Sequence, residues 1–99
     1  ADVAASFQNA VCEALCSHTL RAATDAGVGT IALAGGVASN SALRAMMTAE
    51  AAKRGIAVIY PPPILCTDNG AMIGAAGYYG YINGDFAPLD LNAVPNLPL

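Results

Sequence analysis

Two predicted strand-to-helix turns contain the residues that could do chemistry in this sequence. The first turn holds Gly35 and Gly36 followed by Asn40, and the second holds Asp68. A glycine pair between a strand and a helix lets the backbone approach a phosphate or a nucleoside, and the helix N-terminus adds N–H donors. In a β-α-β unit the strands are parallel, so both turns leave the sheet at the carboxyl edge, where open α/β folds bind ligands. The sequence therefore predicts one ligand site shared by the two turns.

Each of these residues also has a structural interpretation. The glycine pair matches neither the P-loop nor the dinucleotide-binding pattern, and an ordinary tight turn explains it equally well. Asn40, taken alone, is better explained as the N-cap of the helix that follows. Asp68 at a helix start is more often a cap or a partner of the helix dipole than a metal ligand. From the residues alone, these alternatives remain open.

The histidine and the cysteines do not form a recognisable site of their own. His18 is the single histidine, so neither a histidine-rich metal site nor a Ser-His-Asp set can be assembled. Cys12 and Cys16 are one helical turn apart and could share a metal, but burial on an apolar helix face is the more common role of such thiols. Nothing near Cys66 in the sequence marks it as a nucleophile. Three cysteines without CxxC spacing fit a reducing cytoplasm.

The composition predicts a part of a larger protein that does not enter a membrane. Hydrophobic residues make up 56% of the 99 residues and charged residues 11%, against about 25% charged in ordinary soluble domains. This excess, with a first residue that is not Met, suggests a piece cut from a longer chain whose remainder covers the apolar surface. The uncharged stretches 55–67 and 70–84 are interrupted by Pro or Gly and are shorter than the ~20 residues of a membrane span.

The charge of the chain argues against a direct nucleic-acid surface. The formal net charge is −3 and the calculated pI is about 4.6. Binding to nucleic acid depends on Lys and Arg contacts with phosphates, so such contacts would have to come from another part of the protein or from a partner.

The apolar pattern predicts the order α-β-α-β-α with parallel strands. Helices are expected over residues 2–25, from near 39–41 to Gly55, and from near Asp68 through Ala76 toward Tyr81, and strands over 30–33 and 56–60. Two strands are too few for a stable sheet, so the remaining strands are expected upstream. On the first helix, the apolar face is expected to contain Phe7, Val11, Leu15 and Ala22. On the second, it is expected to contain Leu43, Met46, Met47 and Ala51, with Lys53 and Arg54 in the last helical turn. The prolines Pro88, Pro95 and Pro98 predict an extended tail.

Two longer motifs resemble the TsaD family. These are AGGVASN at residues 34–40 followed by Leu43-Arg44, and PPP at 61–63 followed by CTDNGAMI at 66–73. The opening residues 4–8 and the tail 90–97 are similar to the same family. It comprises bacterial transferase subunits that make threonylcarbamoyladenosine in tRNA, formerly labelled O-sialoglycoprotein endopeptidase or glycoprotease.

The resemblance implies a fold and a set of site residues. The fold would be of the actin/Hsp70/sugar-kinase type, with residues 1–99 as the carboxyl-terminal part of the second nucleotide-binding lobe and the first lobe absent from the chain. Gly35 and Gly36 would contact the nucleotide part of the ligand, Asn40 would bind substrate, and Asp68 would be a ligand of an iron or zinc ion. The other two metal ligands in the family are histidines of an HxxH motif, which this sequence lacks and which His18 does not replace.

The resemblance also implies an activity and partners. The parent protein would transfer a threonylcarbamoyl group from its adenylate to the exocyclic amine of an adenosine beside the tRNA anticodon, in the cytoplasm. It would meet tRNA through a complex with other subunits of that machinery. Two alternatives remain: a metallopeptidase, as the older label says, although no general base of the HExxH kind is present, and a non-catalytic nucleotide-binding module.

Overall fold

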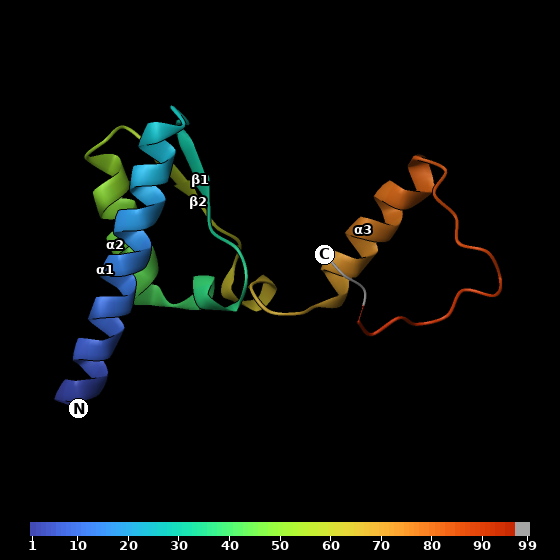
Figure 1. Ribbon diagram of the computed structural model, residues 1–99, viewed down its shortest axis with the longest axis horizontal. Coiled ribbons are helices and arrows are strands. Elements are labelled where there is room, and N and C mark those ends of the chain that lie inside the picture. Colours follow the sequence, from blue (N-terminus) through green and yellow to red (C-terminus); the bar gives the residue numbers. More distant parts are fainter. Residues whose placement is uncertain (97–99) are drawn as a thin grey trace. The chain divides into compact units, whose positions relative to one another are not determined.

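The chain contains the predicted α-β-α-β-α order (Figure 1). The structure, a computed structural model, describes residues 1–96, so Leu97 and Pro98 of the predicted tail lie outside the described residues. Its elements are α1 (Asp2–Asp25), β1 (Thr30–Ala32), the 3-10 helix η1 (Gly36–Ser39), α2 (Ser41–Ala52), β2 (Ala57–Ile59), the 3-10 helix η2 (Pro63–Leu65) and α3 (Gly70–Ile82). They form two compact units, Ala1–Asp68 and a second that begins at Asn69, and each is described by itself.

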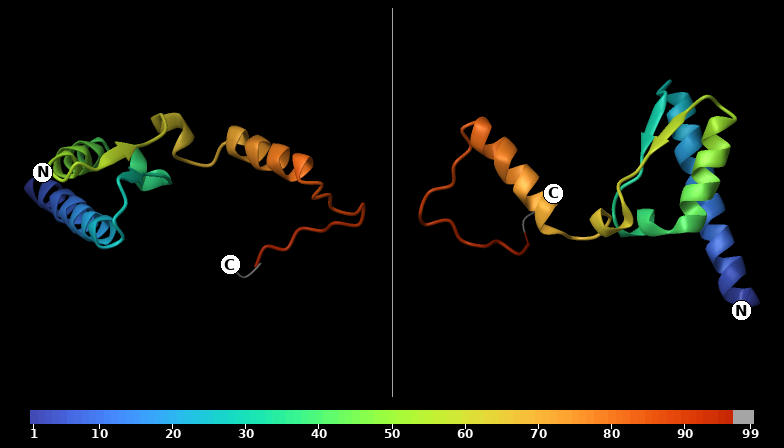
Figure 2. Two further views of the ribbon diagram at one scale, coloured as in Figure 1. Left: turned by 90° about the horizontal axis from the view of Figure 1, so that it is seen from above. Right: turned by 180° about the vertical axis from the view of Figure 1, so that it is seen from behind.

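The first unit is built on a short parallel sheet of β1 and β2. Ile31 pairs with Val58, and the N–H of Leu33 donates to the carbonyl of Ile59 at 2.9 Å just beyond the last paired residues. Both α1 and α2 lie on the same face of this sheet (Figures 1 and 2). The expected buried strand is therefore buried on one face only: in β1 the Ile31 side chain is buried, while Ala32 next to it is exposed.

The core of this unit lies between the two helices and the helix-facing side of the sheet. Met47 and Ala51 on α2 are 1% and 0% exposed, and the predicted apolar side of α2 is thereby confirmed. The helices α1 and α2 pack against each other, and Leu20 of α1 is fully buried with Met47 of α2 in the same cluster. The buried residues of the core are Cys12, Cys16, Leu20, Ala23, Ile31, Leu43, Met47, Ala51 and Ile56.

The buried face of α1 differs from the predicted one. Phe7 is 71% exposed, and Val11 and Leu15 are 37% and 40% exposed. The helix packs instead through Cys12, Cys16, Leu20 and Ala23. The helix has apolar residues on two faces, and the face with these residues is the one that packs against the core. The second apolar face is left open in this chain.

As predicted, α2 begins after an asparagine and is followed by a glycine. Asn40 is the N-cap of α2, and Gly55 follows the helix with a φ of +68° that favours glycine. Lys53 and Arg54, expected in the last helical turn, follow the helix instead, which ends at Ala52. Arg54 still contacts the carboxyl end of the helix, since its Nη1 donates to the carbonyl of Glu50 at 3.1 Å.

The second unit contains α3 and the residues that follow it. The helix runs over Gly70–Ile82, close to the predicted range, and has no buried residue. Residues 83–96 contain neither helix nor strand, as their prolines predict. Across the described residues, 1–96, every helix is too short or too polar to cross a bilayer.

Candidate functional site

The first turn has a backbone that requires glycine at one position. Gly35 has a φ of 80° and a ψ of 173°, a region that essentially only glycine occupies. A Cβ added to Gly35 would meet nothing within 4 Å, so the requirement comes from the backbone and not from crowding. The turn then continues as η1, in which the N–H of Ala38 donates to the carbonyl of Gly35 at 3.0 Å. The two glycines thus form an exposed turn with open space beside it.

The second turn buries a cysteine and exposes a carboxylate. Three prolines lead from β2 into η2, and the Cys66 side chain that follows is 3% exposed. Asp68 is exposed, and its carboxylate makes no hydrogen bond or ion pair with another described residue. The N-cap of α3 is Asn69, whose Oδ1 accepts from the N–H of Met72 at 3.0 Å. The interpretation of Asp68 as the helix cap is therefore wrong, while its interpretation as a partner of the helix dipole is not tested; its side chain is exposed.

The two turns lie next to each other at the carboxyl edge of the sheet, as predicted. Both leave the same ends of the paired strands (Figure 1). A Cβ placed on Gly36 would lie 4.0 Å from the Cγ2 of Thr67, the residue before Asp68. Between the strand ends lies a groove of about 360 Å³ lined by Ala32, Leu33, Ala34, Ile59, Tyr60 and Pro61. The structure thus brings the glycine turn and the aspartate-containing turn to one edge.

Asn40 has two sets of partners and neither includes Asp68. Its Oδ1 accepts from the backbone N–H groups of Ala42 at 2.9 Å and Leu43 at 3.1 Å, which confirms the cap interpretation. Its Nδ2 donates to the Oε1 of Gln8 on α1 at 3.3 Å, a bond exposed to solvent. Asn40 and Gln8 both line an open groove of about 300 Å³ against the uncovered face of α1. The amide N–H groups of Asn40 therefore remain reachable by a ligand.

The double role of Asn40 can be separated by two substitutions in a full-length enzyme that contains this sequence. Asn40→Ala removes cap and amide together, so the free energy of unfolding should fall by about 0.5–2 kcal/mol. Asn40→Ser keeps a good cap and removes the amide donor. If Asn40 binds substrate, both variants should weaken adenylate binding roughly tenfold, the effect of one lost hydrogen bond to a charged group. Urea unfolding and equilibrium titration measure the two quantities. Unchanged affinity in Asn40→Ser would show that Asn40 is a cap only.

Arg44 connects the two turns, although in the sequence it stands out only as part of a motif. It lies in the first turn of α2, is half-buried, and donates to carbonyls on both turns. No periodicity or spacing rule reveals such a residue, because its partners are backbone carbonyls far apart in sequence. A basic residue in the first turn of a helix is unfavourable for the dipole, and this misfit is the one signal the sequence offers.

Cys12 and Cys16 lie buried in the core of the first unit, as expected, and His18 lies apart from them on the surface. Burial, with smaller contributions from Cys12 and Glu50, raises the pKa of the Cys16 thiol, which disfavours the thiolate that binds metals. His18 lies exposed on α1. Among residues 1–96, no three His, Cys, Asp or Glu side chains gather as a metal site.

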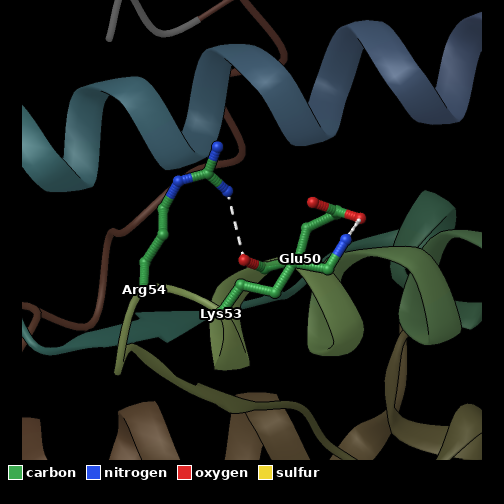
Figure 3. A network of polar contacts seen from close by, with 3 residues as sticks. All are labelled: Glu50, Lys53 and Arg54. Atoms are coloured by element: carbon green, nitrogen blue, oxygen red, sulfur yellow. Dashed lines mark hydrogen bonds and ion pairs between the residues drawn. The ribbon is translucent and has the colours of Figure 1, made fainter.

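A separate polar network lies at the other end of α2 (Figure 3). The Nζ of Lys53 is 2.5 Å from the Oε1 of Glu50, and Arg54 contacts the Glu50 carbonyl. The hydrogen bond from Lys53 lowers the pKa of the Glu50 carboxyl. Because the pair is exposed, it adds little stability. All these contacts stay within the end of one helix, so Arg54 offers a comparison residue for Arg44.

Comparison with known proteins decides the family. The family model for TsaD, described as tRNA N6-adenosine threonylcarbamoyltransferase, matches residues 1–75. The chain belongs to the TsaD family. It is 60% identical over 98 residues to a tRNA N6-adenosine threonylcarbamoyltransferase of Clostridioides difficile and 58% identical over 99 residues to that of Desulfitobacterium hafniense. These matches cover 99% and 100% of this chain but 29% of each relative. Membership implies an actin-like fold, with which the observed α-β-α-β-α order and parallel strands agree.

Proposed function

We propose that the full-length protein containing this chain transfers a threonylcarbamoyl group from its adenylate to the exocyclic amine of an adenosine beside the tRNA anticodon. The observation that supports this most is the meeting of the glycine turn with the Asp68 turn at the carboxyl edge of the sheet. The relatives, which are named for this transfer, are 58–60% identical over the whole segment. The chain spans 29% of their length, so it supplies one part of the site.

In this proposal the first turn holds the adenylate. The exposed backbone of Gly35 and Gly36 approaches the nucleotide without side chains in the way. The N-terminus of α2 follows after η1 and the cap Asn40, and its dipole favours the phosphate. The amide of Asn40 donates to the substrate in place of its exposed bond to Gln8. These contacts orient the carbamoyl carbonyl toward the incoming amine, which lowers the barrier by alignment.

Asp68 supplies one carboxylate to a divalent metal, iron or zinc. The residue fits this role because it is exposed and makes no bond with other described residues, and carboxylate oxygens are ordinary ligands of both metals. A catalytic metal usually has three protein ligands, and residues 1–96 contain no cluster of three. The other two ligands are proposed to be histidines of an HxxH motif in the first lobe. A bound metal supplies Lewis-acid polarisation of the carbamoyl carbonyl.

The first lobe, tRNA and the other subunits are the remaining partners in this proposal. Residues 1–99 form the carboxyl-terminal part of the second lobe, and the first lobe completes the nucleotide cleft. With a net charge of −3, this segment is a poor tRNA surface. We therefore assign tRNA contacts chiefly to the full complex with the other subunits of the threonylcarbamoylation machinery, in the cytoplasm.

The experiment that tests the proposed function is a comparison of two activities. The full-length enzyme with its partner subunits is incubated with threonylcarbamoyl adenylate and tRNA, and modified adenosine is measured by mass spectrometry of the nucleosides. In parallel it is incubated with a sialoglycoprotein. We expect adenylate-dependent modification of tRNA and no cleavage. Cleavage without tRNA modification would favour the metallopeptidase, and neither activity would favour a non-catalytic nucleotide-binding module.

A further inference from the structure

Arg44 lies where its side chain reaches both turns of the proposed site. It is four residues after the cap Asn40, and its N–H donates to the Asn40 carbonyl at 3.1 Å within the first turn of α2. Long side chains on a helix point back toward its N-terminus. The guanidinium of Arg44 is thereby directed to the edge where the two turns meet, and the residue is half-buried there.

The guanidinium contacts each turn through a different nitrogen. Its Nε donates to the carbonyl of Ala38 in the first turn. Its Nη2 donates to the carbonyl of Pro61 at 2.9 Å and to the Sγ of Cys66 at 3.1 Å, both in the second turn. The Cζ atom lies 4.4 Å from the centre of the Tyr60 ring, in the geometry of a cation–π contact. One side chain therefore contacts four residues on two turns.

These contacts extend the connection between the turns past the end of the sheet. The β1–β2 hydrogen bonds stop at Leu33 and Ile59, before either turn begins. Ala38 lies two residues after Gly36, and Cys66 lies two residues before Asp68. Because Arg44 contacts Ala38 and Cys66 at the same time, it constrains the distance between the Gly35–Gly36 turn and the Asp68 turn.

Only arginine suits this arrangement. Its guanidinium is planar and has five donors in a fixed geometry, whereas lysine is a single point charge on a flexible stem. A lysine carries its three donors on one nitrogen, so it does not reproduce the separate Nε and Nη2 contacts to the two turns. The fixed fork is what holds the two turns in register.

We propose that Arg44 is a positioning residue that holds the Gly35–Gly36 turn and the Asp68 turn at the separation that transfer requires. This inference rests on the proposed function, because the contribution to rate presupposes that both turns act on one substrate. A misplacement of about 1 Å between reacting groups can cost roughly a hundredfold in rate. The adenylate and the metal each contact one turn, so their separate affinities depend much less on Arg44.

The test compares Arg44→Ala and Arg44→Lys with the matched control Arg54→Ala in a full-length enzyme that contains this sequence, assayed with its partner subunits. Arg54 has the same charge and lies just after the end of the same helix, where its guanidinium donates to the Glu50 carbonyl, away from both turns. Both Arg44 variants should lower the kcat of transfer about a hundredfold, with adenylate Kd and metal content changed less than about threefold. Added guanidinium ion should restore part of the rate in Arg44→Ala and none in Arg44→Lys. Arg54→Ala should behave as the wild type.

Two results would overturn the proposal. The first is a folded Arg44→Lys enzyme with wild-type kcat. The second is a loss of rate that follows the loss of thermal stability in all variants, without any rescue by guanidinium. If Arg44→Ala fails to fold, Arg44→Lys with its retained charge and stem decides the question.

Hydrogen–deuterium exchange separates this proposal from the proposed function. The backbone N–H groups of Ala38 and Asn40 in one turn and of Leu65 and Cys66 in the other are hydrogen-bonded within their turns. Both sets should exchange at least tenfold faster in the Arg44 variants and not in Arg54→Ala. If the wild type transfers nothing to tRNA, the proposed function fails, and this exchange result still supports or refutes the connection between the turns.

Discussion

Replacing Asp68 by asparagine in a full-length enzyme that contains this sequence is expected to reduce threonylcarbamoyl transfer roughly a hundredfold or more, since even residues that only support a metal ligand cost 10–100-fold. Asparagine has nearly the same shape but no negative charge, and it is a poor ligand for iron or zinc. Stability should be little changed, because the Asp68 side chain is exposed and α3 is capped by Asn69. The effect would therefore be on the site and not on the fold.

The measurements for Asp68→Asn are transfer rate, bound metal and urea unfolding. The matched control is Asp25→Asn, which removes one exposed carboxylate at the end of α1, away from both turns. We expect the control to keep wild-type activity and metal content. Near-normal transfer and metal content in Asp68→Asn would show that the residue is not a metal ligand.

Alanine at Gly35 and at Gly36 is expected to affect the enzyme in two different ways. Gly35→Ala forces a side chain onto a φ of 80° and a ψ of 173°, which should lower the free energy of unfolding by about 1–3 kcal/mol. Gly36→Ala meets only an ordinary contact, 4.0 Å from Thr67, and should change stability by less than about 0.5 kcal/mol. Its methyl group would nevertheless occupy space between the two turns.

The measurement that separates these effects is adenylate affinity beside unfolding. Gly36→Ala should weaken adenylate binding by about tenfold, which corresponds to ~1.4 kcal/mol, at wild-type stability. Gly35→Ala should weaken it as well, together with stability. Gly29→Ala is the control, since a Cβ there meets nothing within 4 Å and its φ is not in the glycine region. If Gly36→Ala binds adenylate as the wild type does, the ligand does not approach this turn.

The sequence predicted the limits of a helix well where a single capping residue determines its start or its end. Asn40 and Gly55 mark the ends of α2 by local chemistry, and the observed limits agree with this within a few residues. The buried face of α1 could not be predicted in the same way. Phe7 and Leu15 are as periodic as Cys16 and are larger, but only packing against α2 determines which face is buried.

The sequence predicted that the two turns lie at one edge of the sheet, but it did not predict that Arg44 connects them. Parallel strands bring both turns to one edge whatever their loops contain. Asp68 and Asn69 are both good helix caps, and the selection of Asn69 depends on its extended backbone after the proline-rich turn. The contacts of Arg44 depend on carbonyls 6 and 17 residues away, and no local pattern contains that information.

The most direct test of the shared site is a crystal structure of a full-length enzyme that contains this sequence, bound to zinc and an adenylate analogue, with the metal located by anomalous scattering. Our account predicts an Asp68 carboxylate oxygen at about 2.0–2.2 Å from the metal, the distance of a direct ligand, and the nucleotide against the backbone of Gly35 and Gly36. A metal whose protein ligands all come from other residues, with Asp68 facing solvent, would contradict it.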